Sequence, residues 1–175
     1  MIVKVDDLMT IPEFSGLSKE TLQMQVDSIE QMVRKYTNNN FQNRNIRFLA
    51  SSVGTVLNGS SPFLVEGDTI QVSGSGVNDG LYIVTDVDES SVIVDRPMFT
   101  ARENLVTKVE YPADVKVGVI NLLKWEVSNR NKVGIKQESI SRYSVTYFDQ
   151  DSNNQVMGYP VSLLGFLEPY KKARF

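Results

Sequence analysis

The stretch Val72–Tyr82, VSGSGVNDGLY, decides how the middle of this chain folds, because it is the densest cluster of glycine in the sequence. A loop that binds a dinucleotide needs Gly-x-Gly-x-x-Gly between a strand and a helix, so that the helix N-terminus faces the pyrophosphate. Here the glycines are Gly74, Gly76 and Gly80, and the apolar run Leu81–Val84 that follows them is typical of a strand. The spacing is wrong, and no Gly-Lys-Ser/Thr is present. The sequence therefore predicts a chain reversal rather than a phosphate-binding loop.

Turn residues recur on both sides of this stretch and separate short segments of alternating apolar side chains. Asn78–Gly80 is the strongest of these turns, because Asn, Asp and Gly reach positive φ at little cost. Several strands at short, regular spacing predict a small antiparallel barrel or sandwich. The expected strands are Ile46–Phe48, Val53–Val56, Thr69–Val72, Leu81–Val87, Ser91–Asp95 and Leu105–Tyr111.

Helical periodicity appears on both sides of the β region. Apolar side chains recur at steps of three and four residues from Lys19 to Tyr36, after Ser18, whose hydroxyl can cap the helix. A second helix is expected from Pro112 to about Asn129, and a short apolar helix from Pro160 to Leu167. The predicted fold class is α+β, with a discontinuous helical core of two long helices and a short C-terminal helix. This core comprises residues 1–45 and 112–175, and the small antiparallel β-barrel or sandwich is inserted at residues 46–111.

The composition excludes several kinds of chemistry. The 175 residues include no Cys and no His, so the chain offers no thiolate nucleophile and no imidazole base or metal ligand. We therefore expect no catalytic centre, no cofactor and no metal site. The net charge is −3 and the 18 Lys and Arg residues are scattered, which does not favour binding to duplex DNA. The sequence shows neither a signal peptide nor an apolar run long enough to cross a bilayer, so a soluble intracellular product is expected.

Three other patterns leave alternatives open. Asp149–Asn154 begins like a calcium-binding loop, but the sixth position is not Gly and the twelfth is Pro160, so a polar turn is expected. Asp86, Asp88 and Glu89 could act as a paired acid and base, although carboxylates at a strand end usually solvate a turn. An enzyme that works through carboxylates alone, as in glycoside hydrolysis, is a further alternative. A module that binds a sugar or a peptide would need exposed aromatic side chains, for which Tyr82 and Phe99 are the candidates.

Three stretches carry a resemblance through their order and spacing. They are FLVEGDTIQVSGSGVNDGLYIVTDV (Phe63–Val87), KQESISRYSVTYF (Lys136–Phe148) and LLGFLEPYKKARF (Leu163–Phe175). Together they resemble the head–tail connector, or portal adaptor, proteins of long-tailed bacteriophages. The first is similar to a small β-domain inserted in some members, the second to the run after their second long helix, and the third to their short apolar helix with its basic end. This chain has Ser141-Arg142 where many members have Gly-Asp, which adds a positive charge.

The resemblance implies a structural virion protein without catalysis. Members of this family form a ring, usually of twelve subunits, under the portal at the capsid vertex, and they leave a central channel for DNA. The implied partners are copies of the chain itself, the portal protein and a stopper or tail-completion protein, with DNA only as passing cargo and no membrane. The implied location is the neck of the virion, after synthesis in the cytoplasm of the bacterial host. A stopper or tail-completion protein of the same neck is the nearest alternative.

Two sets of residues are candidates for contacts in such an assembly. Neighbours in a ring meet head to tail, so one face of each copy must complement a different face of the next. The second face of the first long helix carries two methionines, which is more apolar surface than a solvated side needs. The Lys136–Phe148 run is expected to form a hairpin or loop that reaches a neighbour or the portal, or else an internal strand. The candidate subunit-interface residues are Met24, Gln25, Ser28, Met32, Glu138, Ser139, Ile140, Arg142 and Tyr143. The candidate portal-docking residues are Tyr170, Lys171, Lys172, Arg174 and Phe175.

Overall fold

The computed structural model describes residues 1–129 and 155–173, together with the backbone of residues 137–140 and 143–146. The chain divides into two compact units. The β unit comprises Met1 and Asn39–Tyr111, and the terminal unit comprises Ile2–Asn38 and Pro112–Phe175. The boundary expected between residues 45 and 46 lies inside the first strand of the β unit, which begins at Gln42.

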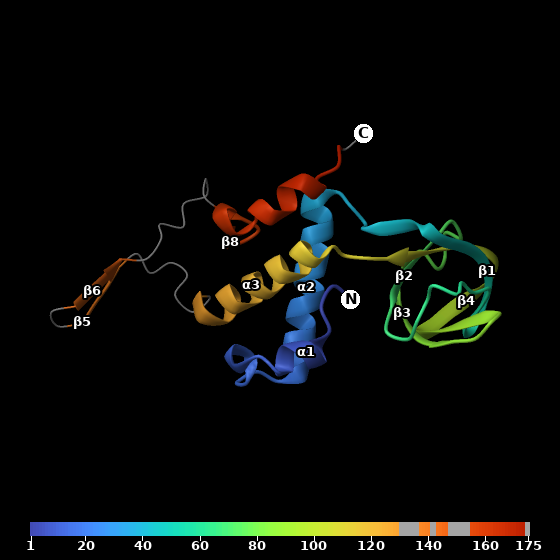
Figure 1. Ribbon diagram of the computed structural model, residues 1–175, viewed down its shortest axis with the longest axis horizontal. Helices are drawn as coiled ribbons and strands as arrows, with labels where there is room; N and C mark the ends of the chain where they lie inside the picture. Colours follow the sequence, from blue (N-terminus) through green and yellow to red (C-terminus); the bar gives the residue numbers. More distant parts are fainter. Residues whose placement is uncertain (130–136, 141–142, 147–154, 174–175) are drawn as a thin grey trace. The chain divides into compact units, whose positions relative to one another are not determined.

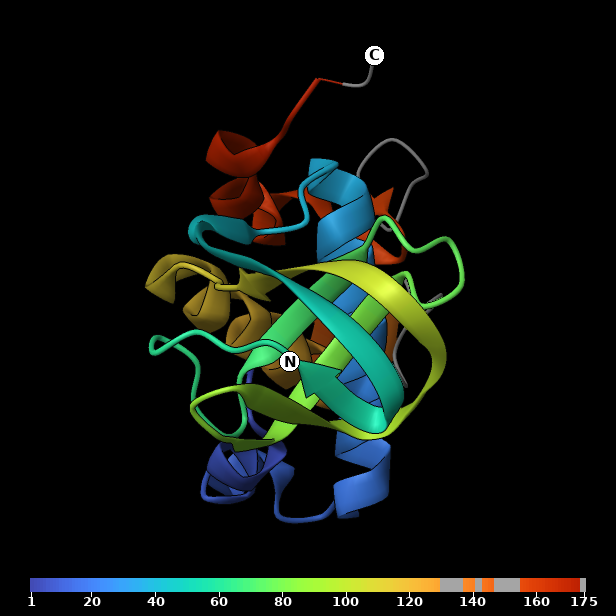
Figure 2. The same ribbon diagram turned by 90° about the vertical axis from the view of Figure 1, so that its right-hand side faces the viewer.

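The β unit is a four-stranded antiparallel sheet that curves strongly (Figure 2). The strands β1 (Gln42–Asn58), β2 (Thr69–Ser73), β3 (Gly80–Val87) and β4 (Ser91–Val109) have the order β1-β4-β2-β3. The end of β4 pairs with β2, with Val106 opposite Val72, and its beginning pairs with β3, with Val94 opposite Val84. The long strand β4 therefore bends, so that its two halves have different neighbours.

The six short strands that the sequence predicts are four strands in the structure. Ile46–Phe48 and Val53–Val56 both belong to β1, while Ser91–Asp95 and most of Leu105–Tyr111 belong to β4. The pairing of β1 with β4 shifts register at several points, including the steps on either side of Ser52. Such bulges interrupt the alternation of apolar side chains without ending the strand, and they also increase its bend. An interrupted pattern therefore resembles two strands in the sequence.

The core of the β unit lies within the curved sheet and draws on all four strands. The loop between β1 and β2 contributes Leu64, which is 4% exposed. Burial of these apolar side chains removes their surface from water and is the main favourable contribution to the folding of this unit. The buried residues of this cluster are Ala50, Leu57, Leu64, Ile70, Val72, Tyr82, Val84, Val92, Val94, Met98 and Val106.

The glycine-rich stretch is a turn between two strands, as the sequence predicts. Gly74 and Gly76 have φ of 85° and 72°, a conformation that glycine adopts without steric cost. Asp79 Oδ1 accepts hydrogen bonds from the N–H groups of Ser75 and Gly76 at 3.2 and 3.1 Å. The positive φ predicted at Asn78–Gly80 is wrong, because none of these three residues has one.

Asn78 instead fixes the turn to the sheet through its side chain, which is almost fully buried. Its Oδ1 accepts from the Phe99 N–H at 2.8 Å, and its Nδ2 donates to the Phe99 carbonyl at 2.9 Å. The same Nδ2 lies 3.0 Å from Ser52 Oγ and 3.1 Å from Asn104 Oδ1, and the Tyr82 hydroxyl donates to the Asn78 carbonyl at 3.0 Å. Buried amides are tolerated when their hydrogen bonds are satisfied in this way.

The terminal unit combines helices with short hairpins (Figure 1). Ser18 caps its longest helix by accepting from the Thr21 N–H at 3.2 Å, and Asn38, with φ of 49°, ends that helix in the left-handed conformation. The helices expected from Lys19 and from Pro112 are confirmed as α2 and α3. The elements are α1 (Val5–Met9), η1 (Pro12–Phe14), α2 (Lys19–Thr37), α3 (Ala113–Asn129), β5 (Gln137–Ile140), β6 (Tyr143–Thr146), β7 (Gln155–Val156), β8 (Tyr159–Pro160), η3 (Val161–Leu163) and η4 (Gly165–Tyr170).

The predicted fold class is wrong. The described chain is mixed α/β with a four-stranded antiparallel sheet, and although α2 and α3 are its only helices of seven or more residues, they do not form a two-helix core. Most of the packing of α2 is against α1 and η4, and α3 also packs against η1, η3 and η4. The expected C-terminal α-helix consists of two short 3₁₀ segments, with Gly165 at the start of the second and Pro169 inside it. Both residues disfavour a continuous α-helix.

One close contact shows how η4 is seated in the terminal unit. Gly118 lies in the middle of α3 and is buried, and a Cβ at this position would collide with the Phe166 ring. Ala is otherwise the better helix former. The glycine therefore permits the approach of η4 to α3.

Candidate interaction surfaces

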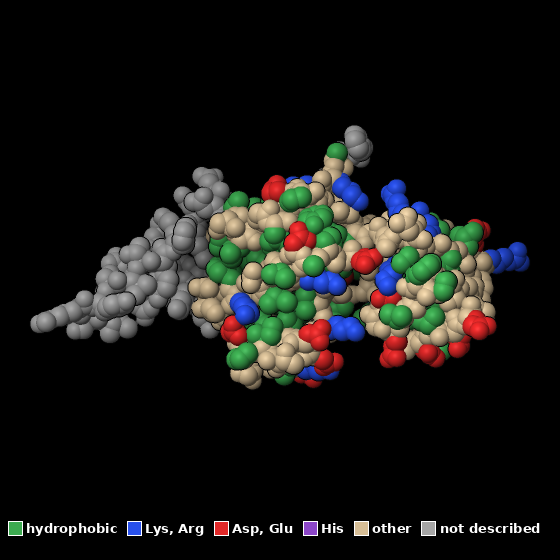
Figure 3. All heavy atoms as spheres, in the orientation of Figure 1, with side chains coloured by type: hydrophobic (Ala, Val, Ile, Leu, Met, Phe, Trp, Pro, Cys, Tyr) green, Lys and Arg blue, Asp and Glu red, His purple; other side chains and the backbone are tan. Residues whose placement is uncertain are grey.

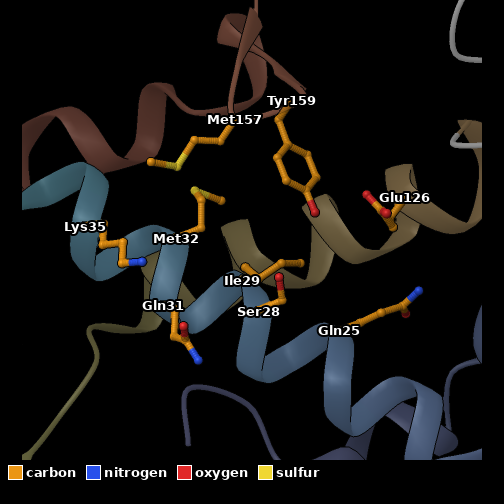
Figure 4. Close-up of a pocket in the computed structure, with 9 residues that line it drawn as sticks. All are labelled: Gln25, Ser28, Ile29, Gln31, Met32, Lys35, Glu126, Met157 and Tyr159. Carbon is orange, nitrogen blue, oxygen red and sulfur yellow. The ribbon is translucent and has the colours of Figure 1, made fainter.

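A groove of about 350 Å³ runs along the second face of α2 in the terminal unit. Its apolar lining consists of Ile29 and Met32 from α2, with Met157 and Tyr159 from the β7–β8 hairpin. Figure 4 shows the side chains of Met32 and Met157 directed toward each other. The polar residues around it are Gln25, Ser28, Gln31, Lys35 and Glu126. An apolar centre with a polar rim is the composition of a typical protein–protein interface.

The β7–β8 hairpin holds Met157 in an unusual backbone conformation. Met157 has φ of 52° and the next residue, Gly158, has φ of 84°. Glycine adopts such angles freely, whereas a non-glycine residue in the left-handed region is destabilised by about 1–2 kcal/mol. The Met157 side chain is nevertheless 57% exposed, so burial within the subunit does not account for a methionine at this position.

The hairpin is anchored to α3 through its other side. Tyr159 is 7% exposed, and the centroid of its ring lies 5.6 Å from that of the Trp125 ring, at an interplanar angle of 55°. This is within the range of favourable tilted aromatic pairs. Tyr159 therefore fixes the hairpin beside the groove, where it presents Met157.

The interface residues predicted on α2 lie on or beside this groove. Gln25, Ser28 and Met32 line it, and Met24, which is 67% exposed, lies one turn before Ser28 on the same side of the helix. Met32 is 8% exposed and so belongs to the floor rather than to the open surface. The Gln25 Oε1 atom is buried without a hydrogen-bond partner among the described residues.

The predicted interface residues Glu138, Ser139 and Ile140 belong to β5, and Tyr143 belongs to β6. These two strands pair with each other in antiparallel register, from Gln137 opposite Thr146 to Ile140 opposite Tyr143. Within the part of the chain that the structure describes, they pair with no other strand. The two strands therefore pair as in a hairpin, whereas contact of this run with a neighbour or the portal stays a prediction. Arg142 and the Ser141-Arg142 connection lie outside the described residues.

The basic end that was predicted to dock on the portal makes internal contacts as far as Ala173. The Tyr170 hydroxyl donates to both carboxylate oxygens of Asp114 at 2.8 Å, and this hydrogen bond raises the pKa of Tyr170. The Asn38 side chain donates to the Ala173 carbonyl at 2.9 Å. Lys172 has an exposed side chain, and Arg174 and Phe175 lie outside the described residues.

Lys171 is held at the C-terminal part of α2. Its Nζ donates to Glu168 Oε1 at 2.7 Å and to the Tyr36 hydroxyl at 3.0 Å, and it lies 4.1 Å from the centroid of the Tyr36 ring. The hydrogen bond to Glu168 raises the pKa of Lys171, and the same bond lowers the pKa of Glu168. These contacts account for Lys171 within the subunit, so its proposed docking role stays a prediction.

The residues of the alternative functions are not gathered into one site. Tyr82 is buried, with the Arg96 guanidinium 4.3 Å from its ring centroid, whereas Phe99 is 72% exposed. Asp86 accepts from the Val87 N–H and Asp88 from the Ser91 hydroxyl, which are the turn contacts expected for the run Asp86–Glu89. The described residues contain no group of carboxylates placed to hold a metal ion, and the calcium-like stretch Asp149–Asn154 lies outside them.

Sequence reasoning missed two residues that shape these surfaces. Met157 lies in the turn between two short strands, directly before a glycine. Turns are predicted from residues such as Asn, Asp and Gly, so the methionine at this position does not indicate a turn. The sequence favours positive φ at Asn78, whereas this residue acts through the hydrogen bonds of its side chain. Side-chain hydrogen bonds to residues far along the chain, such as those of Asn78 to Phe99 and Ser52, are not apparent from a single sequence.

Neither a protein-family profile nor a curated protein sequence matches this chain. Among the described residues, no helix has both the length and the apolar character needed to span a membrane.

Proposed function

We propose that this chain is a structural subunit of a bacteriophage neck, which forms a ring with copies of itself on the capsid portal and joins it to the tail or stopper. The proposed ring leaves a channel for DNA, is located in the virion and carries out no catalysis. The resemblance of three stretches to head–tail connectors supports this role.

The observation that carries the proposal is Met157 at the groove on α2. A methionine in the left-handed conformation is less stable than Asn or Gly would be, and its side chain is exposed in the isolated chain. Burial of Met157 against a neighbouring copy would account for both features, because methionine adapts well to irregular apolar surfaces. Exposed Met24 extends the same face.

The test introduces charged residues on this face and measures the mass of the assembly that each variant forms. The double variant Met24→Glu/Ser28→Glu places two carboxylates beside the groove on exposed positions, so the subunit should fold and the ring should be lost. The matched control is Val117→Glu, which introduces a charge at an exposed valine of α3 that does not line the groove. A ring of unchanged mass in the double variant contradicts the assignment of this face.

A further inference from the structure

A groove of about 510 Å³ lies on the β unit. One wall is the loop from Ser60 to Glu66, between β1 and β2, and the other is the end of β3 with the turn that follows it, from Asp86 to Glu89. Buried Leu64 and half-buried Val87 line it, with exposed Val65 at its edge. This volume is within the range of about 300–1,000 Å³ that is typical of sites for small ligands.

Backbone hydrogen bonds hold both walls in place. The Gly59 N–H donates to the Ser90 carbonyl at 2.8 Å, which joins the start of the loop to the turn. The Gly67 N–H donates to the Val84 carbonyl at 2.8 Å, which joins the end of the loop to β3. A groove fixed in this way loses little conformational freedom when it is occupied.

The charged residues that line the groove are all acidic. They are Glu66, Asp86, Asp88 and Glu89, and each is exposed. The nearby Lys108 is paired with Asp68 at 2.7 Å and donates to the Phe63 carbonyl, so its charge is already engaged. Figure 3 shows acidic side chains along the lower edge of the β unit. The groove therefore combines an apolar lining with carboxylates that no lysine or arginine of the lining neutralises.

The acidic groove is complementary in charge to a basic segment of the same sequence. Asp86-Val-Asp-Glu89 is the densest acidic run of the chain, and Lys171-Lys-Ala-Arg174 is the densest basic run, followed directly by Phe175. Lys171 is engaged by Glu168, whereas the Lys172 side chain is exposed. The segment Lys172–Phe175 thus offers two cations and an aromatic ring.

We propose that Lys172–Phe175 of a second copy of this chain occupies the groove, an inference that rests on the proposed assembly of copies. The cations lie against the carboxylates of the two walls, and the Phe175 ring packs on Leu64 and Val65. This pairing of one surface with a different surface of the next copy is the head-to-tail contact that generates rings. Because the ion pairs are exposed, the contact depends on salt and needs the apolar part for its affinity.

The test is a titration of the full chain with a fluorescent peptide of residues Tyr170–Phe175, YKKARF, followed by anisotropy at low salt. We expect saturable binding that weakens by about tenfold when the ionic strength is raised from about 0.01 M to about 0.15 M. This change shortens the Debye length from about 30 Å to about 8 Å. Glu89→Lys should weaken binding by about tenfold, and Val65→Ser by severalfold, because each removes a contact in the groove. The matched control Glu103→Lys makes the same charge change at an exposed site of the β unit that does not line the groove, and it should change binding by less than about twofold.

Each outcome decides the proposal. No binding, or binding that Glu89→Lys and Glu103→Lys weaken equally, overturns it. The proposal is also overturned if YKKARF binds the portal protein but not this chain. That result would favour docking of the basic end on the portal. The peptide titration does not require a ring, so an intact ring together with a peptide that does not bind would reject this contact while the proposed function stands.

Discussion

The side chain of Asn78 holds the backbone of Phe99 through both of its polar groups, with Oδ1 2.8 Å from the Phe99 N and Nδ2 2.9 Å from the Phe99 O. Phe99 itself is 72% exposed. The glycine-rich stretch thus contains a residue that fastens its turn to β4, which gives the turn a structural role in the β unit.

Asn78→Ala should destabilise the β unit by about 2–4 kcal/mol, because it removes hydrogen bonds from polar groups that are shielded from water. The Phe99 N–H and Asn104 Oδ1 each lose their hydrogen bond with Asn78, and Ser52 Oγ keeps only its bonds to the Phe99 carbonyl and Asn104 Nδ2. Urea unfolding monitored by far-ultraviolet circular dichroism measures the change. The matched control Asn58→Ala removes one exposed hydrogen bond to Ser51 and should cost less than about 0.5 kcal/mol. Equal effects of the two substitutions would contradict the role of Asn78.

Gly118→Ala should destabilise the terminal unit by about 1–3 kcal/mol, even though alanine favours helix, because its methyl group collides with the Phe166 ring. Thermal unfolding measures the loss of stability. The smaller side chain in Gly118→Ala/Phe166→Leu should restore part of that stability. Gly16→Ala is the control, since nothing lies within 4 Å of a Cβ there, and it should be neutral or slightly stabilising. A Gly118→Ala protein as stable as the parent would show that η4 is not seated as described.

Met157→Asn should stabilise the isolated subunit by about 0.5–1 kcal/mol and at the same time weaken its assembly, because asparagine tolerates the left-handed conformation but offers no apolar contact. Met24→Asn is the comparison, since the same change at an exposed methionine in α2 should lower stability by about 0.5 kcal/mol through helix propensity. Chemical unfolding and the mass of the assembly give the two readouts. A Met157→Asn protein that assembles as well as the parent would remove the argument from this residue.

The carboxyl group of Glu168 should titrate below the ordinary range of glutamate, because the hydrogen bond from Lys171 lowers its pKa. Since the pKa in the folded state is the lower one, this contact stabilises the fold above the ordinary glutamate pKa and is lost as the pH falls through the lowered value. Nuclear magnetic resonance of the side-chain carboxyl carbon follows the titration. Lys171→Met should raise the midpoint toward the ordinary value, whereas Lys172→Met should leave it unchanged. An unchanged midpoint in Lys171→Met would contradict the assigned cause.

The sequence predicts the elements of this fold better than their arrangement. The 3.6-residue spacing of apolar side chains marks α2 and α3, and the Ser18 cap marks the start of α2. The spacing of apolar residues shows which face of each helix is buried but not which element covers that face. The predicted core of two long helices is therefore wrong. The bends of β1 and β4 were missed because a bulge looks like the end of a strand.

The candidate surface was found only in part. Met24, Gln25 and Ser28 could be chosen because an exposed second face of an amphipathic helix is visible in the sequence. The opposite wall of the groove comes from Met157 and Tyr159, more than a hundred residues further along the chain, and only the fold brings them to α2. The aromatic and basic side chains of Tyr170 and Lys171 favour docking in the sequence, and in the structure each has a partner within the subunit, Asp114 and Glu168.

The most direct measurement is the native mass of the full chain, alone and mixed with the portal protein of the same phage. We expect the chain to add to the portal as a ring of many copies and Met24→Glu/Ser28→Glu to prevent this. A chain that stays monomeric in both samples and never binds the portal would contradict the proposal that it works by fitting against copies of itself and its virion neighbours.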